Sequence, residues 1–443
     1  MAYEIILGRD AHERELFGLR GTILLGKHYV KMGQVTALSQ PVYLDLNRAH
    51  VVFIAGKRGS GKSYALGVIA EGISMIEDLE IRNRLSVVIL DTMGIYWTMK
   101  YANHRDEAMF KDWGLEGHGI NVEIHTPFAF YDDWKEKGIP TDFPFAINPG
   151  ELLPDDWNTA FELAPTDPIA VFIEGVILKL HDSRGISFSL DEIIAAVQAD
   201  KEESDTVRHA AVNRFLLAKS WGVFSDKATQ MKDLAKPGTV SVIDLSPYVT
   251  VPNGWHIKTL VLGIVSKKLF TERMLARRFE EFEAVESAVH YLLEEEHKGG
   301  PQMPIVWLMI DEAHEFLPNQ GKVGSTEALM TLLREGRQPG IAMVMATQQP
   351  GKIHTDAMTQ SDIILGHRLT AKIDTDALGA LVQSYLRTGI DRELDNLPKL
   401  PGAALAMDDV NERIYPMRIR PRVSWHGGSA PTVVQIKKKI YEF

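Results

Sequence analysis

Runs of apolar residues mark the chain near residue 50 and again in its second half. Uninterrupted runs cover residues 51–55, 305–310 and 341–345, and shorter strand-like segments cover 87–90, 240–243 and 363–365. Strands that are apolar on both faces are typical of a parallel sheet with helices on both sides. After the first run, Leu66, Ile69 and Ile73 keep the spacing of one helix face, from about Lys62 onward. The pattern therefore predicts an α/β fold with a mostly parallel sheet.

Residues 151–237 follow a different, helical pattern. Pro168 lies where proline begins a helix, and Ser189 with Glu192 has the form of a capping box. We therefore predict a helical insertion within the α/β core. A long charged helix precedes residue 305, with Phe282, Val285, Val289 and Leu292 at helical spacing. The predicted organisation is a short N-terminal β element at 1–50, a first core segment at 51–150, the insertion at 151–237, a second core segment at 238–420 and an extended C-terminal arm at 421–443.

Composition narrows the class of protein. The 443 residues include no cysteine, which excludes disulfides and thiolate metal sites. No apolar stretch reaches the roughly 20 residues that span a bilayer, and no secretory signal is visible, so we expect a cytoplasmic protein without a membrane partner. The net charge of −11 argues against a surface that coats nucleic acid, but a few placed cations would suffice for a local DNA channel.

The strand at 51–55 leads directly into the motif G-x-x-x-x-G-K-S. Backbone N–H groups of such a loop cradle phosphates, and the following helix N-terminus adds its positive dipole end. Lys62 is expected to reach the β- and γ-phosphates of ATP, and the Ser63 hydroxyl to bind Mg²⁺. The order strand, loop, helix favours this over a glycine-rich surface turn. The predicted nucleotide-binding residues are Gly56, Lys57, Arg58, Gly59, Ser60, Gly61, Lys62, Ser63 and Tyr64.

An acidic pair ends the apolar run at 305–310. Asp311 is predicted to hold magnesium through water and Glu312 to polarise the attacking water, the roles that an ATPase needs beside its P-loop. Residues 311–314 also spell the DEAH box of superfamily-2 helicases. The chain has one P-loop and no second set of helicase motifs, so we interpret that match as coincidence.

Two further polar segments flank the run at 341–345. Gln348 follows it, where an amide can sense the γ-phosphate or serve as an ordinary turn residue. Arg334 and Arg337 lie at the end of the preceding predicted helix. Basic residues there commonly interact with the helix dipole, and residue chemistry alone favours that interpretation over an arginine finger.

Taken together, these motifs resemble the HerA-type ATPases of the HerA–FtsK superfamily. The segments that carry the resemblance are Gly56–Ser63, 91–96, Ile147-Asn148-Pro149, 310–314, 334–340, 346–350, 361–369 and 425–428. The resemblance covers about residues 20–428, and its most specific part runs from Glu335 to Leu369.

The resemblance implies a RecA-like P-loop core in a homohexameric ring that couples ATP hydrolysis to translocation along double-stranded DNA. It implies a helicase-like role in DNA repair or antiviral defence, beside a NurA-like nuclease or another effector. It also implies that Glu312 is the catalytic glutamate, that Arg337 acts in trans, with Arg368 as a second candidate, and that Gln348 senses the γ-phosphate.

The chain departs from the family pattern in three places. Its N-terminal segment is shorter than the usual β-barrel, Ile95 replaces a common acidic residue, and Lys57 and Arg58 make the P-loop unusually basic. Two alternatives stay open: a nucleotide-dependent scaffold that assembles an effector with little translocation, and a conjugation or packaging pump.

Overall fold

One large sheet forms the centre of the molecule. The computed structural model describes residues 4–32, 35–289, 302–380 and 390–428. Within them, thirteen strands are ordered β1-β3-β2-β13-β12-β11-β4-β10-β9-β5-β8-β6-β7. The strands are β1 (Ile5–Leu7), β2 (Thr22–Met32), β3 (Val35–Asp45), β4 (Val51–Ala55), β5 (Leu85–Asp91), β6 (Val122–Pro127), β7 (Phe143–Phe145), β8 (Val240–Asp244), β9 (Ile305–Ile310), β10 (Ile341–Thr347), β11 (Ile363–His367), β12 (Ala403–Asp408) and β13 (Arg413–Ile419).

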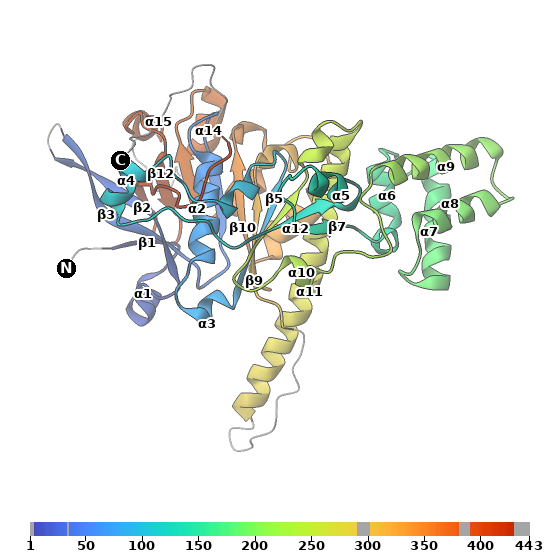
Figure 1. Ribbon diagram of the computed structural model, residues 1–443, viewed down its shortest axis with the longest axis horizontal. Helices are drawn as coiled ribbons and strands as arrows, with labels where there is room; N and C mark the ends of the chain where they lie inside the picture. The colour runs from blue at the N-terminus through green and yellow to red at the C-terminus, as the bar shows by residue number, and fades with distance from the viewer. Residues whose placement is uncertain (1–3, 33–34, 290–301, 381–389, 429–443) are drawn as a thin grey trace.

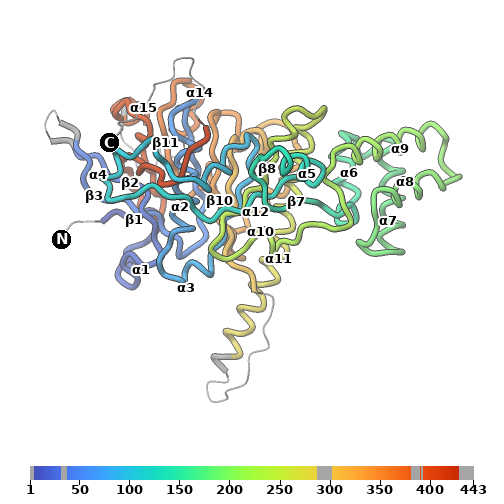
Figure 2. The backbone as a smooth tube through the Cα atoms, in the orientation of Figure 1, coloured from blue at the N-terminus to red at the C-terminus, as the bar shows by residue number. Residues whose placement is uncertain are grey.

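The sheet has a parallel part and a mainly antiparallel part, and in the latter only β1 pairs parallel, with β3. From β11 to β7 every pairing is parallel, with β4 between β11 and β10. On the other side, β11, β12, β13, β2 and β3 pair antiparallel. The predicted α/β fold class is confirmed, and the N-terminal strands continue the main sheet through the pairing of β2 with β13. Figure 2 shows these strands, from opposite ends of the chain, on one side of the molecule.

Helices cover both faces of this sheet and extend beyond it. They are α1 (Ala11–Phe17), α2 (Lys62–Ser74), α3 (Leu79–Arg82), α4 (Glu107–Trp113), α5 (Phe128–Glu136), α6 (Pro154–Ala160), α7 (Pro168–Arg184), α8 (Leu190–Ala199), α9 (Asp205–Ser220), α10 (Met231–Leu234), α11 (Gly254–Val289), α12 (Thr326–Glu335), α13 (Thr355–Thr359), α14 (Lys372–Gly379) and α15 (Ile390–Asp395). In Figure 1, α7, α8 and α9 lie beyond one end of the sheet, and the second half of α11 projects away from it. No helix in the described part of the chain is long and apolar enough to cross a membrane.

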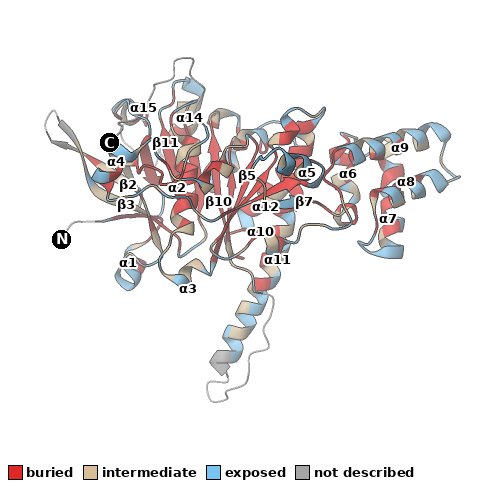
Figure 3. Cartoon of the chain, in the orientation of Figure 1, coloured by how far each residue is buried: buried red, intermediate tan, exposed pale blue. Residues whose placement is uncertain are grey.

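The apolar runs are buried on both faces, as their pattern predicts. Along β4, Val52 and Ile54 pack in a core with α2, whereas Val51 and Phe53 pack in a second core that includes α11 and α12. Figure 3 shows the buried strands between partly exposed helices. Burial on both faces fixes the position of the strand ends, where the candidate site lies.

Two helices of 151–237, α7 and α8, begin at the predicted signals. Asp167 caps α7 through the N–H of Ile169, at 2.8 Å. At the start of α8, the Ser189 N–H donates to Glu192 at 2.8 Å, which completes the capping box. The division of the chain into domains stays a prediction.

One predicted helix continues beyond the described residues, and one predicted extended segment is buried in the structure. The charged helix is α11, and it is described up to Val289, so Leu292 lies outside the described residues. Residues 421–424 were expected to start an extended arm, but all four are buried. Burial there arises because Arg422 and Ser424 bond to Glu71 beneath them.

Candidate nucleotide-binding site

The P-loop is held between the ends of three adjacent strands. It follows β4, where the Gly56 N–H donates to the Thr347 carbonyl of β10 at 3.2 Å, and the Lys57 N–H donates to the Arg368 carbonyl beyond β11 at 2.9 Å. Gly61 has φ of 113°, a conformation that disfavours any residue with a Cβ. No side chain caps the N-terminus of α2, so its first N–H groups stay available for phosphate.

A cavity of about 800 Å³ joins the P-loop to the acidic pair. Of the predicted site residues, those that line it are Arg58, Gly59, Gly61, Lys62, Ser63, Tyr64, Asp311 and Glu312. Lys62 is buried, at 6% exposure, and the parallel pairing of β4, β10 and β9 places Asp311 at the same sheet edge as the P-loop. The structure therefore brings together residues that lie about half the chain apart in sequence.

Asp311 is fixed by hydrogen bonds from two directions. The Tyr96 hydroxyl donates to its Oδ2 at 3.0 Å, and the Glu312 N–H donates to its Oδ1 at 2.9 Å. Glu312 itself has φ of 51°, in the left-handed region that is strained for a residue other than glycine. Strain of this kind is kept where the surrounding structure imposes it, and it clusters at functional sites.

Glu312 has the electrostatic environment of a base rather than of a structural anion. Burial, and then repulsion from Asp311, raises its pKa to about 7, while Lys62 opposes the rise. Its Oε2 is buried without a hydrogen-bond partner, 3.6 Å from Nδ1 of His314. Burial lowers the pKa of His314, so this neighbour is neutral at pH 7 and does not neutralise the carboxylate. A buried oxygen without a partner, on a residue that lines the same cavity as the P-loop, fits a role toward a bound water.

The donor set suits magnesium with few protein ligands. In the described ranges, no three or more His, Cys, Asp or Glu side chains form a metal-binding group. Mg²⁺ in phosphoryl-transfer sites keeps several waters and is held by one or two protein oxygens together with phosphates. Ser63 and Asp311 on one cavity fit that pattern.

Asp91 shapes the turn that supplies Tyr96. Its carboxylate accepts the N–H groups of Met93, Gly94, Ile95 and Tyr96 at 2.7 to 3.1 Å. Burial and the neighbouring Asp244 raise the pKa of Asp91 to about 7, and these N–H donors oppose that rise. The turn places Met93 and Ile95 on the cavity wall.

The remaining predicted residues lie outside this cavity. Lys57, Ser60 and Arg368 line a neighbouring hollow of about 410 Å³, which also touches Gly59, and the Arg368 side chain is exposed. Gly56 lies at the base of the loop, bonded to β10. Gln348 follows β10, and its backbone N–H bonds to Glu312, which places it beside the acidic pair.

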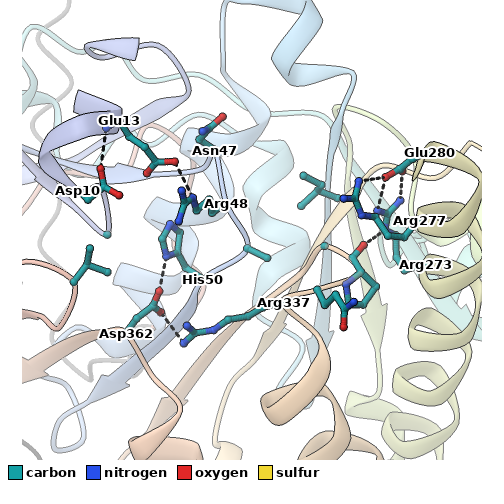
Figure 4. A pocket seen from close by; sticks show the side chains of 17 residues that line it. Asp10, Glu13, Asn47, Arg48, His50, Arg273, Arg277, Glu280, Arg337 and Asp362 are labelled. Atoms are coloured by element: carbon teal, nitrogen blue, oxygen red, sulfur yellow. Dashed lines mark hydrogen bonds and ion pairs between the residues drawn. The ribbon is translucent and has the colours of Figure 1, made fainter. Parts of the chain in front are cut away.

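Arg337 lies at the opposite edge of the sheet from the P-loop. It precedes β10, whose far end adjoins the P-loop, and it lines a separate cavity of about 400 Å³ with His50 and Asp362. Figure 4 shows its guanidinium directed toward Asp362. Its Nη2 donates to the Gln360 carbonyl at 2.5 Å and lies 3.5 Å from Asp362 Oδ1. The structure thus does not bring Arg337 to the nucleotide cavity of its own chain.

Several cavity residues carry no local signal in the sequence. Asp106, Met109 and Trp113, in and just before α4, line the cavity, and so do Arg418 and His426 near the C-terminus. The ring of His426 meets that of Tyr64 edge to face, with centroids 5.4 Å apart. Apart from His426, which lies in a quoted motif, no spacing rule could have found them, because long-range packing brings these segments together.

The sheet, the P-loop and the acidic pair define a P-loop ATPase with a RecA-like core. A family model described as "Helicase HerA, central domain" matches residues 30–254, about half of the chain. The chain belongs to this HerA family, as the motifs predicted.

Individual relatives are more distant. The DNA double-strand break repair helicase HerA of Pyrococcus furiosus is 28% identical over 147 residues, 32% of this chain and 26% of that protein. The chain therefore matches about a quarter of the length of that curated relative. VirB4 of Thermoanaerobacter pseudethanolicus superposes with a TM-score of 0.53 at 14% identity, covering 90% of this chain and 96% of that one. This second likeness concerns the fold alone.

A viral protein is similar more weakly. The genome packaging NTPase B204 of Sulfolobus turreted icosahedral virus 2, in complex with ATP-gammaS, has a TM-score of 0.35 at 12% identity, covering 84% of this chain and 98% of that chain.

Proposed function

We propose that this chain is the ATP-hydrolysing subunit of a hexameric motor that moves double-stranded DNA. The observation that carries the proposal is the single cavity on which Lys62, Ser63 and Glu312 meet. Family membership supports hydrolysis of ATP, and the likeness to the DNA double-strand break repair helicase of Pyrococcus furiosus supports DNA as the substrate. We place the motor in the cytoplasm, beside a nuclease or defence effector that acts on the DNA.

In this proposal each residue of the cavity has one task. The P-loop N–H groups and Lys62 hold the β- and γ-phosphates, and Ser63 and Asp311 hold Mg²⁺, which neutralises phosphate charge when it is bound. Glu312 accepts a hydrogen bond from the attacking water and orients that water in line with the γ-phosphate. Gln348, bonded through its backbone to Glu312, senses whether the γ-phosphate is present.

The proposal assigns the remaining cation at the γ-phosphate, an arginine, to a neighbouring copy of the chain. Arg337 is 45% exposed and lies on the edge of the sheet remote from its own P-loop, so it is free to face another subunit. A trans-acting arginine of this kind contributes about 10³-fold or more to phosphoryl transfer. Arg368, exposed beside its own P-loop, is the alternative source of a cation in cis.

DNA-stimulated hydrolysis tests the proposal. Release of phosphate by the wild type is measured with and without linear double-stranded DNA, and the Glu312→Gln variant is the control for contaminating ATPases. A motor turns over faster on DNA, and the variant is inactive in both conditions. A wild type that binds ATP but hydrolyses it no faster on DNA would favour the scaffold alternative instead.

A further inference from the structure

The cavity beside Arg337 contains an imidazole clamped between two carboxylates. His50, just before β4, is 2% exposed; its Nε2 lies 2.9 Å from Asp45 Oδ2 and its Nδ1 lies 2.6 Å from Asp362 Oδ2. Ionised carboxylates only accept hydrogen bonds, so both ring nitrogens donate and His50 is an imidazolium. Figure 4 shows the row that results: His50, then Asp362, then Arg337.

The surroundings hold this clamp still. Arg9 donates through Nε to Asp45 Oδ1 at 2.7 Å, which neutralises the far carboxylate. Gly8 packs against the imidazole so closely that a Cβ there would lie 2.7 Å from Cε1 of His50. Both ring nitrogens are therefore engaged as donors, and the ring has no space in which to rotate.

Asp362 connects the clamp to the P-loop strand. Its Oδ1 accepts the Val51 N–H, at the first residue of β4, at 2.8 Å, and its own N–H donates to the Val51 carbonyl at 3.2 Å. Five residues later, β4 ends and the P-loop begins. A strand rises about 3.3 Å per residue, so a rigid, fully buried segment of roughly 17 Å separates Asp362 from the P-loop.

The contact between Asp362 and Arg337 is weaker than the others made by that carboxylate. The 3.5 Å separation exceeds that of a charge-assisted hydrogen bond, and the arginine is nearly half exposed. Because His50 already compensates the charge of Asp362, the guanidinium is oriented without being held as a buried ion pair. Such an arginine is available to an anion on another molecule.

We propose that His50 and Asp362 are positioning residues for Arg337, orienting it from the first residue of the P-loop strand toward the nucleotide of a neighbouring copy. The inference rests on the proposed function, in which Arg337 acts in trans. Without Asp362 the guanidinium keeps the Gln360 carbonyl as an acceptor but loses the neighbouring carboxylate that orients it. Without His50 the uncompensated carboxylate holds the guanidinium too tightly. Either change therefore lowers turnover in the neighbouring subunit.

Mixed rings separate this role from a general structural one. One parent carries Lys62→Ala, with a dead P-loop and an intact arginine, and the other carries Arg337→Ala, with an intact P-loop and no arginine. Turnover then arises only where the intact P-loop of the second parent meets the arginine of the first. Asp362→Asn is added to either parent in turn, and phosphate release by the mixture is compared.

We expect turnover to fall about tenfold or more when Asp362→Asn is in the arginine donor, because displacements of about 1 Å cost on the order of 10²-fold. In the P-loop donor, whose arginine is absent, the same substitution leaves turnover unchanged. Equal effects in both parents, or none in either, overturn the positioning role of His50 and Asp362 but leave the trans role of Arg337 standing. No turnover in the unmodified mixture overturns the trans role of Arg337 and the inference with it. His50→Gln, in the same design, gives the result if Asp362→Asn does not fold.

Discussion

Glu71 of the P-loop helix and Arg422 of the C-terminal segment form a fully buried ion pair, with Arg422 Nε 3.0 Å from Glu71 Oε1. Arg420 adds a second buried contact at 2.9 Å, and the Ser424 hydroxyl donates a third. Burial alone would raise the pKa of Glu71, but the two arginines hold it below its usual value. This network fastens the C-terminal wall of the nucleotide cavity to the helix that begins with Lys62.

Removing the Glu71 carboxylate should destabilise the whole fold. Glu71→Ala leaves two arginines buried without their anion, and breaking one side of a buried pair costs about 3–5 kcal/mol. Urea unfolding measures the change. Glu80→Ala is the matched control, because Glu80 pairs with Arg20 on the exposed surface, where a salt bridge contributes about 1 kcal/mol or less. Similar small losses for both variants would show that the network does not support the fold.

The two central residues of the cavity should separate binding from turnover. Lys62→Ala removes the P-loop cation and should weaken ATP binding. Glu312→Gln should bind ATP normally and lose about 10²-fold or more in kcat, because an amide cannot act as a base. Binding is measured with a fluorescent ATP analogue and turnover by phosphate release. The control is Glu315→Gln, three residues further along and outside the cavity, which should keep most of the activity. If Glu312→Gln also keeps most of the activity, Glu312 is not the catalytic base.

The Tyr64 hydroxyl should matter for stability and for nucleotide affinity together. It accepts the Arg422 N–H at 2.6 Å and donates to Asp106 at 2.9 Å, so it joins α2 to two walls of the cavity. Tyr64→Phe leaves the Arg422 N–H without its acceptor, which costs about 1–3 kcal/mol. We expect a lower urea midpoint and a higher Kd for ATP. An unchanged Kd with reduced stability would show that the walls are independent of this residue.

The clamped imidazole makes stability depend on pH. Burial opposes the charged form of His50, but the carboxylates of Asp362 and Asp45 outweigh it and raise the pKa from 6.5 to about 9. A raised pKa stabilises the fold fully below pH 6.5, and the contribution is lost as the pH rises through 9.

The free energy of unfolding should therefore fall by on the order of 3 kcal/mol between pH 6 and pH 10. Urea titrations across that range measure it. The decline should be smaller in His50→Gln but kept in His104→Gln, which replaces an exposed histidine. The same slope in all three proteins would contradict the clamp.

DNA binding should be confined and sensitive to salt. With a net charge of −11, the surface as a whole repels DNA, so contacts must come from a local set of lysines and arginines. Phosphate contacts of this kind lose affinity by orders of magnitude between about 50 and 200 mM salt. Fluorescence anisotropy with a labelled duplex measures the slope. Equal affinity across that range would mean that binding is not to the phosphate backbone.

The sequence predicted those parts of the site that are local. The apolar run of β4, the glycines after it and the N-terminus of α2 are consecutive, so one segment holds the P-loop signal. Asp311 and Glu312 end a strand that is apolar on both faces, and parallel pairing then brings their edge to the P-loop.

The missed residues depend on long-range packing. Tyr96 and His426 lie in quoted motifs, but the sequence did not show that a turn around Asp91 brings Tyr96 to Asp311, or that Trp113 and His426 line one cavity with the P-loop. Arg337 lies at the edge remote from its own P-loop because it precedes β10, which runs parallel to β4. The predicted partners and the ring itself concern other molecules and stay predictions.

Electron microscopy of the Glu312→Gln variant with ATP and linear double-stranded DNA tests the central claim most directly, because the variant should bind both without turning over. We predict six-membered rings with DNA in the pore and Arg337 of each subunit at the P-loop of the next. Monomers, or rings that exclude DNA and leave Arg337 away from the neighbouring P-loop, would contradict the account.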